Sequence, residues 1–339
     1  MVKKEVEEKI MPVGGQAVIE GVMMRSPKRI ATAIRRANGE IEIKTDAYES
    51  LVQRKKSLNI PVLRGAVTLI EVMILGIKTL QWSADKAMED LDEEERKKGK
   101  KVKEKKKSGM STANAIFTVT IALMIGIGMF FVLPLYITTE LFNIEKEAML
   151  FNLVSGGIRI MFFMLYVWGI SFMKDVKRLF QYHGAEHKSI FAFEDKVYLS
   201  AANVQKYSTF HPRCGTSFIV IVMLVSLVFF AFLDTAIISM TGGINLVTRL
   251  LTHIPFIPLV GGISYEALKA SAKYADSRFV YTLILPGLGL QRITTSQPDD
   301  AQVEVAIAAL RAALGEEYEG ELVEENLIKE KTPTAEDAV

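Results

Sequence analysis

Long hydrophobic runs dominate the second half of the chain. The first, 112–137, carries no charged residue; the second, 148–173, carries one arginine; and the third, 217–240, carries one aspartate. About 20 apolar residues in a helix cross the ~30 Å hydrocarbon core of a bilayer. We therefore predict a transmembrane helix in each run.

A fourth run, 246–267, is less regular. It contains two prolines and Gly261-Gly262, and it also carries Arg249 and His253. Proline removes a backbone donor and bends helices, so this pattern predicts a short or kinked fourth span. The apolar stretch at 279–290 is interrupted by a Pro-Gly pair and is too short to cross, so we predict a re-entrant or interfacial segment.

The ends of the chain are more polar. Pro298-Asp299-Asp300 is typical of a helix start, and apolar residues at 303, 306, 307, 310 and 314 then recur on one face. This predicts a soluble helix that completes the unit 279–314. Residues 315–339 are acidic and are predicted to be disordered.

Residues 12–50 have the pattern of a small β unit. The stretches 17–24 and 30–36 are apolar and partly β-branched, and residues 41–45 alternate strictly. Asn38-Gly39 between the last two predicts a type I′ hairpin turn.

The segment 60–84 is apolar with one polar stripe, formed by Arg64, Thr68, Glu71 and Lys78. Because three charges in lipid would be costly, we predict an amphipathic helix at the membrane interface; a polar-striped span inside a bundle would give the same pattern. Residues 85–110 are predicted to be a charged linker. Its basic half, 96–107, has nine basic residues and one Glu, a composition that attracts anionic lipid.

Composition supports a membrane protein. Half of the 339 residues are hydrophobic although 24% are charged, and the mean hydropathy is +0.23. The two populations must therefore be segregated along the chain. We predict an α-helical integral membrane protein with about four transmembrane helices, a small amino-terminal β unit and a carboxy-terminal cytoplasmic helix. Its membrane domain covers residues 112–278.

Basic residues indicate the orientation. The basic cluster precedes the first span and Lys174, Lys177 and Arg178 follow the second, whereas the loop 138–147 has three Glu and one Lys. The positive-inside rule then places both termini and the loop 174–216 in the cytoplasm, with the spans in the cell membrane. A net charge of +2 excludes a generally basic nucleic-acid binder, but a protein partner or a homo-oligomer is compatible with the sequence.

Candidate chemistry gathers in that loop. His183, Glu186 and His187 form the pattern His-x-x-Glu-His, in which two imidazoles one helical turn apart bind a divalent metal and the glutamate acts as general base. His211 or Cys214 would supply a third ligand. Nitrogen and sulfur donors favour zinc.

Other roles for these residues remain open at this point. The imidazoles could bind backbone groups at the membrane boundary and no metal, and Gly184 weakens the helix on which the metal geometry depends. Cys214 could be a nucleophile beside His211. Glu186 could pair with Lys188 or with Arg213.

Three further ionisable residues lie in apolar surroundings: Glu20, Arg25 and Glu266. Each could join a polar site or form an ion pair, and for Glu266 we favour a pair with an arginine. A lysine-containing phosphate loop, a Gly-x-Ser-x-Gly motif and a dinucleotide fingerprint are all missing from the sequence, which argues against an ATPase, a serine hydrolase and an NAD enzyme.

Several motifs together resemble a known family. They are Gly14–Arg25 (GGQAVIEGVMMR), Tyr182–Lys188 (YHGAEHK), His211–Ser217, Pro286–Gln291 and Thr294-Thr295. In this order they are similar to the YqhQ-like family of bacterial membrane proteins, whose function is undetermined and which are commonly labelled predicted metal-dependent enzymes. The resemblance covers about residues 12–314 and implies a metal at the histidines, but no substrate.

Three functions are consistent with these features. The first is a zinc-dependent hydrolase of the cytoplasmic membrane. The second is a membrane scaffold or assembly factor in which the His/Cys cluster is structural. The third is a small-solute or ion transporter, suggested by the charges and breaks of the fourth run.

Overall fold

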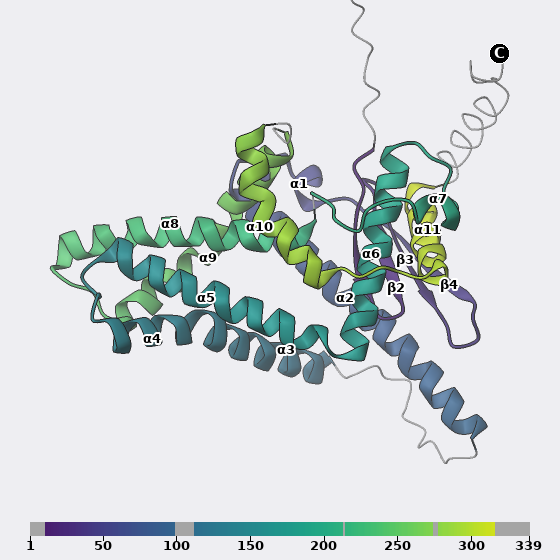
Figure 1. Ribbon diagram of the computed structural model, residues 1–339, viewed down its shortest axis with the longest axis horizontal. Helices are drawn as coiled ribbons and strands as arrows, with labels where there is room; N and C mark the ends of the chain where they lie inside the picture. Colours follow the sequence, from purple (N-terminus) through teal and green to yellow (C-terminus); the bar gives the residue numbers. More distant parts are fainter. Residues whose placement is uncertain (1–10, 99–111, 213, 274–276, 316–339) are drawn as a thin grey trace, which may run out of the picture.

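The computed structural model describes residues 11–98, 112–212, 214–273 and 277–315 (Figure 1). A bundle of long helices forms one part, and a small sheet with helices on both faces forms the other. Four helices in the described residues are long and apolar enough to cross a membrane: Phe117–Phe142, Ala148–Ser171, Gly215–Thr241 and Leu246–Ser271. The predicted fold class, a helical membrane protein with an amino-terminal β unit, is confirmed.

The first three spans correspond to the three long apolar runs. The first consists of α3 (Thr112–Ile127), the π-helical turn η2 (Gly128–Val132) and α4 (Leu133–Phe142). The others are α5 (Ala148–Ser171) and α8 (Gly215–Thr241).

The fourth run forms one helix, α9 (Leu246–Lys273), which continues through Pro255 and Pro258. Of the two predicted alternatives, a short or a kinked span, the short one is therefore wrong. A proline removes one hydrogen bond, and packing within a bundle compensates for that loss. The next segment likewise forms an uninterrupted helix, α10 (Arg278–Thr294), with Pro286 inside it. Gly287 allows α10 to approach α8 closely, because a Cβ there would lie 2.8 Å from Cα of Ser217.

The β unit is a four-stranded antiparallel meander in the order β1-β2-β3-β4. Its strands are β1 (Gly14–Val18), β2 (Gly21–Arg25), β3 (Arg29–Arg35) and β4 (Ile41–Ala47). The apolar stretch 17–24 is divided between β1 and β2 by a turn at Ile19-Glu20, where Glu20 has φ +55°. The hairpin after β3 lies at Asn38-Gly39 as predicted. It is not type I′, which needs positive φ at both residues, since only Gly39 has one.

The sheet lies between helices. One face packs through Val18 and Ile34 against α2 (Leu63–Lys97), where Leu75 and Trp82 meet it. The other face packs through Val22 and its neighbours against α6 (Lys174–Glu194) and α11 (Asp300–Leu314). Short helical turns connect these parts: α1 (Leu51–Arg54), η1 (Lys56–Leu58) and α7 (Ala201–Val204).

Helix α2 is longer than predicted. The acidic half of the proposed linker continues it to Lys97, since Glu and Lys favour helix and three of these side chains pair with the β3–β4 hairpin or with each other. Ile70, Met73, Ile74 and Ile77 form an exposed apolar stripe on it, the pattern of an interfacial helix. Residues 99–107, with most of the basic cluster, and the acidic tail from 316 onward lie outside the described residues.

Helix α6 does not continue the second span. Helix α5 ends at Ser171, and the extended backbone of Met173 (φ −71°, ψ 132°) redirects the chain before α6 begins. Helix α6 therefore leaves the bundle and runs along the sheet (Figure 1). This turn places the predicted metal-binding motif between the sheet and the ends of the spans.

Candidate metal centre at the bundle end

Two histidines on α6 are held by backbone carbonyls from distant segments. Nδ1 of His183 lies 2.8 Å from the carbonyl oxygen of Thr294, at the end of α10. Nδ1 of His187 lies 2.5 Å from the carbonyl oxygen of Thr209. A carbonyl oxygen only accepts, so each neutral imidazole carries its hydrogen on Nδ1 and leaves a lone pair on Nε2. Metal-binding histidines are usually oriented in this way.

Cys214 completes a group of three. It caps the amino terminus of α8, where its Sγ accepts a hydrogen bond from the Thr216 N–H. Sγ also lies 3.2 Å from Nε2 of His183. One ligand atom from each of His183, His187 and Cys214 lies within 4.8 Å of the other two.

The donor set fits a zinc ion. Two imidazole nitrogens and one sulfur are typical zinc ligands, and three of them leave a fourth position open. Nε2 of His187 is buried and has no hydrogen-bond partner, although an unsatisfied buried polar atom is costly. A bound cation would remove this cost.

Glu186 lies beside the two imidazoles. Its Oε2 is 3.6 Å from Nε2 of His187 and 3.9 Å from Nε2 of His183, and it is 5% exposed. Burial raises the pKa of the Glu186 carboxyl group, while the nearby side chains of His183 and His211 and the N–H of Gly15 act in the opposite direction. A carboxylate with a raised pKa is suited to accept a proton.

The alternative ion pair of Glu186 with Lys188 does not form in the described residues. Nζ of Lys188 donates instead to the carbonyl oxygens of Gln205 and Tyr207, at 2.8 and 2.6 Å. The other predicted partner, Arg213, lies outside the described residues.

His211 lies next to the group but outside it. Its ring centroid is 5.5 Å from that of His187, and its Nε2 is 3.7 Å from a carboxylate oxygen of Glu194. Gln291 on α10 holds its backbone from both sides: Oε1 accepts from the His211 N–H and Nε2 donates to the His211 carbonyl, both at 2.8 Å. Of the two proposed third ligands, the structure therefore brings Cys214 to the histidine pair.

The group opens into a cavity of about 380 Å³. Residues 13–17 of the β1 segment form one wall, and α6 and the first turns of α8 form the others. Leu179, Phe180 and Ile219 add apolar surface. Because α8 begins here, the cavity lies where a span enters its apolar part.

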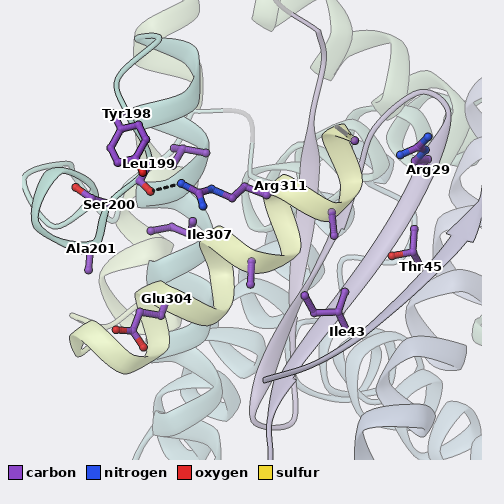
Figure 2. Close-up of a pocket in the computed structure, with 13 residues that line it drawn as sticks. Arg29, Ile43, Thr45, Tyr198, Leu199, Ser200, Ala201, Glu304, Ile307 and Arg311 are labelled. Atoms are coloured by element: carbon purple, nitrogen blue, oxygen red, sulfur yellow. Dashed lines mark hydrogen bonds between the residues drawn. The ribbon is translucent and has the colours of Figure 1, made fainter. Parts of the chain in front are cut away.

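A larger hollow, of about 710 Å³, lies elsewhere, between α11, the segment before α7 and strands β3 and β4 (Figure 2). Arg311 donates to the carbonyl oxygen of Leu199 within it, at 3.0 Å. Its described lining includes Arg29 and Glu304 but neither histidine nor cysteine. Size alone therefore does not identify the chemical site.

The other predicted polar residues form contacts away from the cluster. Glu20 forms a bidentate ion pair with Arg178. Arg25 lies on the ring of Tyr48, with its Cζ 5.4 Å from the centroid. Glu266 pairs with Arg64 through two hydrogen bonds of 2.6 and 2.5 Å, which is the ion-pair alternative favoured from the sequence.

Sequence reasoning missed the residues that hold the two histidine ligands, Glu186 and His211 in place. Gly15, Thr209, Gln291 and Thr294 act mainly through backbone groups or an amide, which leave no pattern of their own. Gly15, Gln291 and Thr294 do lie in the motifs that resemble the YqhQ-like family, and that was the available signal.

A second polar cluster lies inside the bundle. Asp234 accepts hydrogen bonds from Asn152 (2.8 Å) and from Arg249 (2.9 Å), and His253 Nε2 lies 2.8 Å from its other oxygen. Asp234, Arg249 and His253 are fully buried. The cluster joins α5, α8 and α9.

Comparison with known proteins identifies the family of the chain. Residues 60–316 match the model of the family described as "Protein of unknown function (DUF1385)". The chain is also 32% identical over 322 residues to "Uncharacterized protein YqhQ" of Bacillus subtilis (strain 168), covering 91% of this chain and 94% of that protein. No solved structure matches. The chain therefore belongs to the DUF1385 family, and its resemblance to the YqhQ-like proteins is confirmed.

Proposed function

We propose that this protein is a zinc-dependent hydrolase at the cytoplasmic face of the cell membrane. His183, His187 and Cys214 are the ligands and Glu186 is the general base. The observation that carries the proposal is the pair of Nδ1 hydrogen bonds, which leave the Nε2 atoms of both histidines as the metal-binding atoms of a group that also holds the thiol. Zinc bound by three protein ligands lowers the pKa of a coordinated water and polarises a carbonyl oxygen.

Other residues of the chain have separate roles in the proposed reaction. The carbonyls of Thr209 and Thr294 fix the tautomer and direction of the imidazoles. Glu186 receives a proton from the attacking water and delivers it to the leaving group, a role supported by its burial beside both histidines. The apolar wall excludes bulk water around the reacting group.

One alternative function, with Cys214 as a nucleophile, is supported by a separate observation. The 3.2 Å contact between Cys214 Sγ and His183 Nε2 would also suit a thiolate nucleophile activated by histidine. In that case the thiol, and not a metal, would be the reactive group. A scaffold with a structural metal would need a fourth protein ligand, for which His211 is the nearest histidine.

Metal analysis of the full chain, purified in detergent without chelators, tests these functions. We expect about one zinc per chain, loss of zinc in His187→Ala, and retained zinc without hydrolysis of casein or p-nitrophenyl esters in Glu186→Gln. The matched control is His211→Asn, which keeps its zinc if three ligands suffice and loses it if the metal is structural. Metal-free wild-type protein whose Cys214 reacts rapidly with iodoacetamide would instead support the thiol nucleophile.

A further inference from the structure

Strand β1 exposes one edge to the candidate catalytic cavity. It is the terminal strand of the sheet, with β2 on one side and no further strand on the other within the described chain. Residues 13–17 line the cavity together with Glu186 and the three proposed ligands. Gly15 is exposed to solvent although it lies beside a buried carboxylate. The wall of the cavity is therefore an open strand edge.

Two N–H groups along this edge point away from β2. The N–H of Gly15 donates to the Glu186 carboxylate, and the N–H of Ile19 donates to Ser83 Oγ at 3.1 Å, so neither N–H is used in the ladder with β2. Peptide groups of an antiparallel strand alternate in direction with every residue. Ala17 lies between these two in register, so its N–H and C=O face the same edge.

Glycine at position 15 permits this arrangement. A Cβ there would lie 2.9 Å from Cγ of Glu186 and 2.7 Å from the carbonyl oxygen of Met23. At Gly14 a Cβ would meet open space. The missing side chain at Gly15 brings the carboxylate against the strand, so that a chain paired with β1 would pass directly beside Glu186.

The chemistry of the lining favours an uncharged substrate. Among the described residues that line the cavity there is no lysine or arginine, whereas phosphate groups are usually bound by such side chains. Leu179, Phe180, Ile190 and Ile219 provide apolar surface for a side chain. These features suit a peptide better than a phosphoester.

We infer that the cavity binds a polypeptide in extended conformation, which adds to β1 as a fifth strand and is cleaved beside Glu186. This inference rests on the proposed hydrolase and names its substrate class. Backbone hydrogen bonds to Ala17 and to the Gly15 carbonyl hold the substrate, and the apolar wall receives one of its side chains. In the reaction, water oxygen bonds to the substrate carbonyl carbon and the C–N bond breaks. Glu186 takes one proton from the water and passes it to the leaving nitrogen, giving a carboxylic acid and an amine.

The test uses a dansyl-labelled Ala-Leu-Leu hydroxamate, whose peptide part reaches along the strand, and acetohydroxamate, which lacks that part. Binding to the full chain in detergent is measured by fluorescence and by competition. We expect the peptide hydroxamate to bind at least tenfold more tightly than acetohydroxamate. Methylating its backbone nitrogens, which removes the donors, is expected to abolish that advantage.

A variant tests the strand from the side of the protein. Ala17→Pro removes the outward N–H at an edge position, where proline is tolerated, and is expected to remove the peptide preference while zinc content stays unchanged. Zinc is measured on every sample. Zinc-loaded wild-type protein that binds the peptide and its N-methyl analogue equally overturns the edge-strand inference alone. Wild-type protein without zinc overturns both this inference and the proposed hydrolase.

Discussion

His183 and Thr294 are 111 residues apart in the chain and are joined by a 2.8 Å hydrogen bond between the imidazole and a backbone carbonyl. The bond links α6, which lies on the sheet, to the end of α10, which packs on the membrane helix α8. Gln291, less than one helical turn earlier on α10, holds the His211 backbone in the same region. The last turn of α10 therefore fixes both halves of the candidate site.

Replacing Gln291 should show how much its two hydrogen bonds to the His211 backbone, called the clamp below, contribute to the stability of the fold. Gln291→Met keeps the side-chain length but removes the acceptor of the buried His211 N–H and one of the two donors to the His211 C=O, so we expect a loss of about 1–3 kcal/mol in the free energy of unfolding. Gln297→Met is the control, because the bond of Gln297 to Gln205 is exposed. Denaturant titration in detergent measures both. Equal stability of the two variants would show that the clamp is not needed.

The close approach of Gly15 and Glu186 gives a second prediction. In Gly15→Ala the new methyl group would overlap a backbone oxygen that cannot move freely, so we expect a loss of about 1–3 kcal/mol in stability. Gly14→Ala meets open space and should change stability by less than about 0.5 kcal/mol. Thermal unfolding of the two variants, side by side, makes the comparison. A destabilised Gly14→Ala protein would indicate that the whole strand, and not this contact, is sensitive.

The sequence predicted those parts of the molecule that depend on local patterns. The four apolar runs predicted the spans because a membrane helix needs a continuous apolar length, and His-x-x-Glu-His predicted two imidazoles on one helix face. It did not predict the continuity of α9 and α10 through their prolines, because that depends on packing with neighbouring helices. Nor could spacing predict the carbonyls of Thr209 and Thr294, since any residue offers a carbonyl and only the tertiary fold selects which one.

The polar cluster inside the bundle should be essential to its stability. Asp234→Asn removes the charge that faces buried Arg249, and breaking a buried pair in this way costs about 3–5 kcal/mol. Asp85→Asn, at an exposed position on α2, is the matched control. We expect a fall in the detergent melting temperature for the first variant alone. If Asp234→Asn melts like wild type, Asn152 and His253 are sufficient to hold the three helices.

Acid should loosen the contact between the β3–β4 hairpin and α2. Arg36 binds both Asp90 and Glu42. Burial opposes ionisation of each carboxyl group, but hydrogen bonds from Arg36 and other donors lower the pKa of Glu42 below 4.5 and that of Asp90 below 3.8. A carboxyl group whose pKa is lower in the folded than in the unfolded state stabilises the fold at any pH above its unfolded-state pKa. This contribution is lost as the pH falls through its folded-state pKa.

We therefore expect wild-type stability to fall below about pH 4.5. Arg36→Met should lose about 1–2 kcal/mol at pH 7 and respond less to acid in this range, because its carboxyl groups titrate closer to their unfolded values. Urea titrations between pH 7 and pH 3 measure both curves. Parallel curves for the two proteins would show that other carboxylates determine the acid response.

The last prediction is that α2 does not cross the membrane, so that both of its ends lie on the cytoplasmic side. Its first turn pairs with the carboxy-terminal part of α9, through Arg64–Glu266 and through Gly65 packed on Gly262. Its last turns pair with the β3–β4 hairpin through Asp90. The same sheet packs on α6, which follows the second span. If four helices cross the membrane, the end of the second span and the end of the fourth lie on the same side of it.

Membrane-impermeant thiol labelling in intact cells tests this arrangement. Leu58→Cys and Met88→Cys should both be protected until the membrane is permeabilised, and a reporter fused after residue 143 should lie on the opposite side from one fused after residue 195. The orientation follows from the basic residues beside the first two spans. If the two cysteines are labelled on opposite sides, α2 is a fifth span and one terminus of the chain lies outside the cell. The candidate site and the two ends of α2 would then not all lie on the cytoplasmic side.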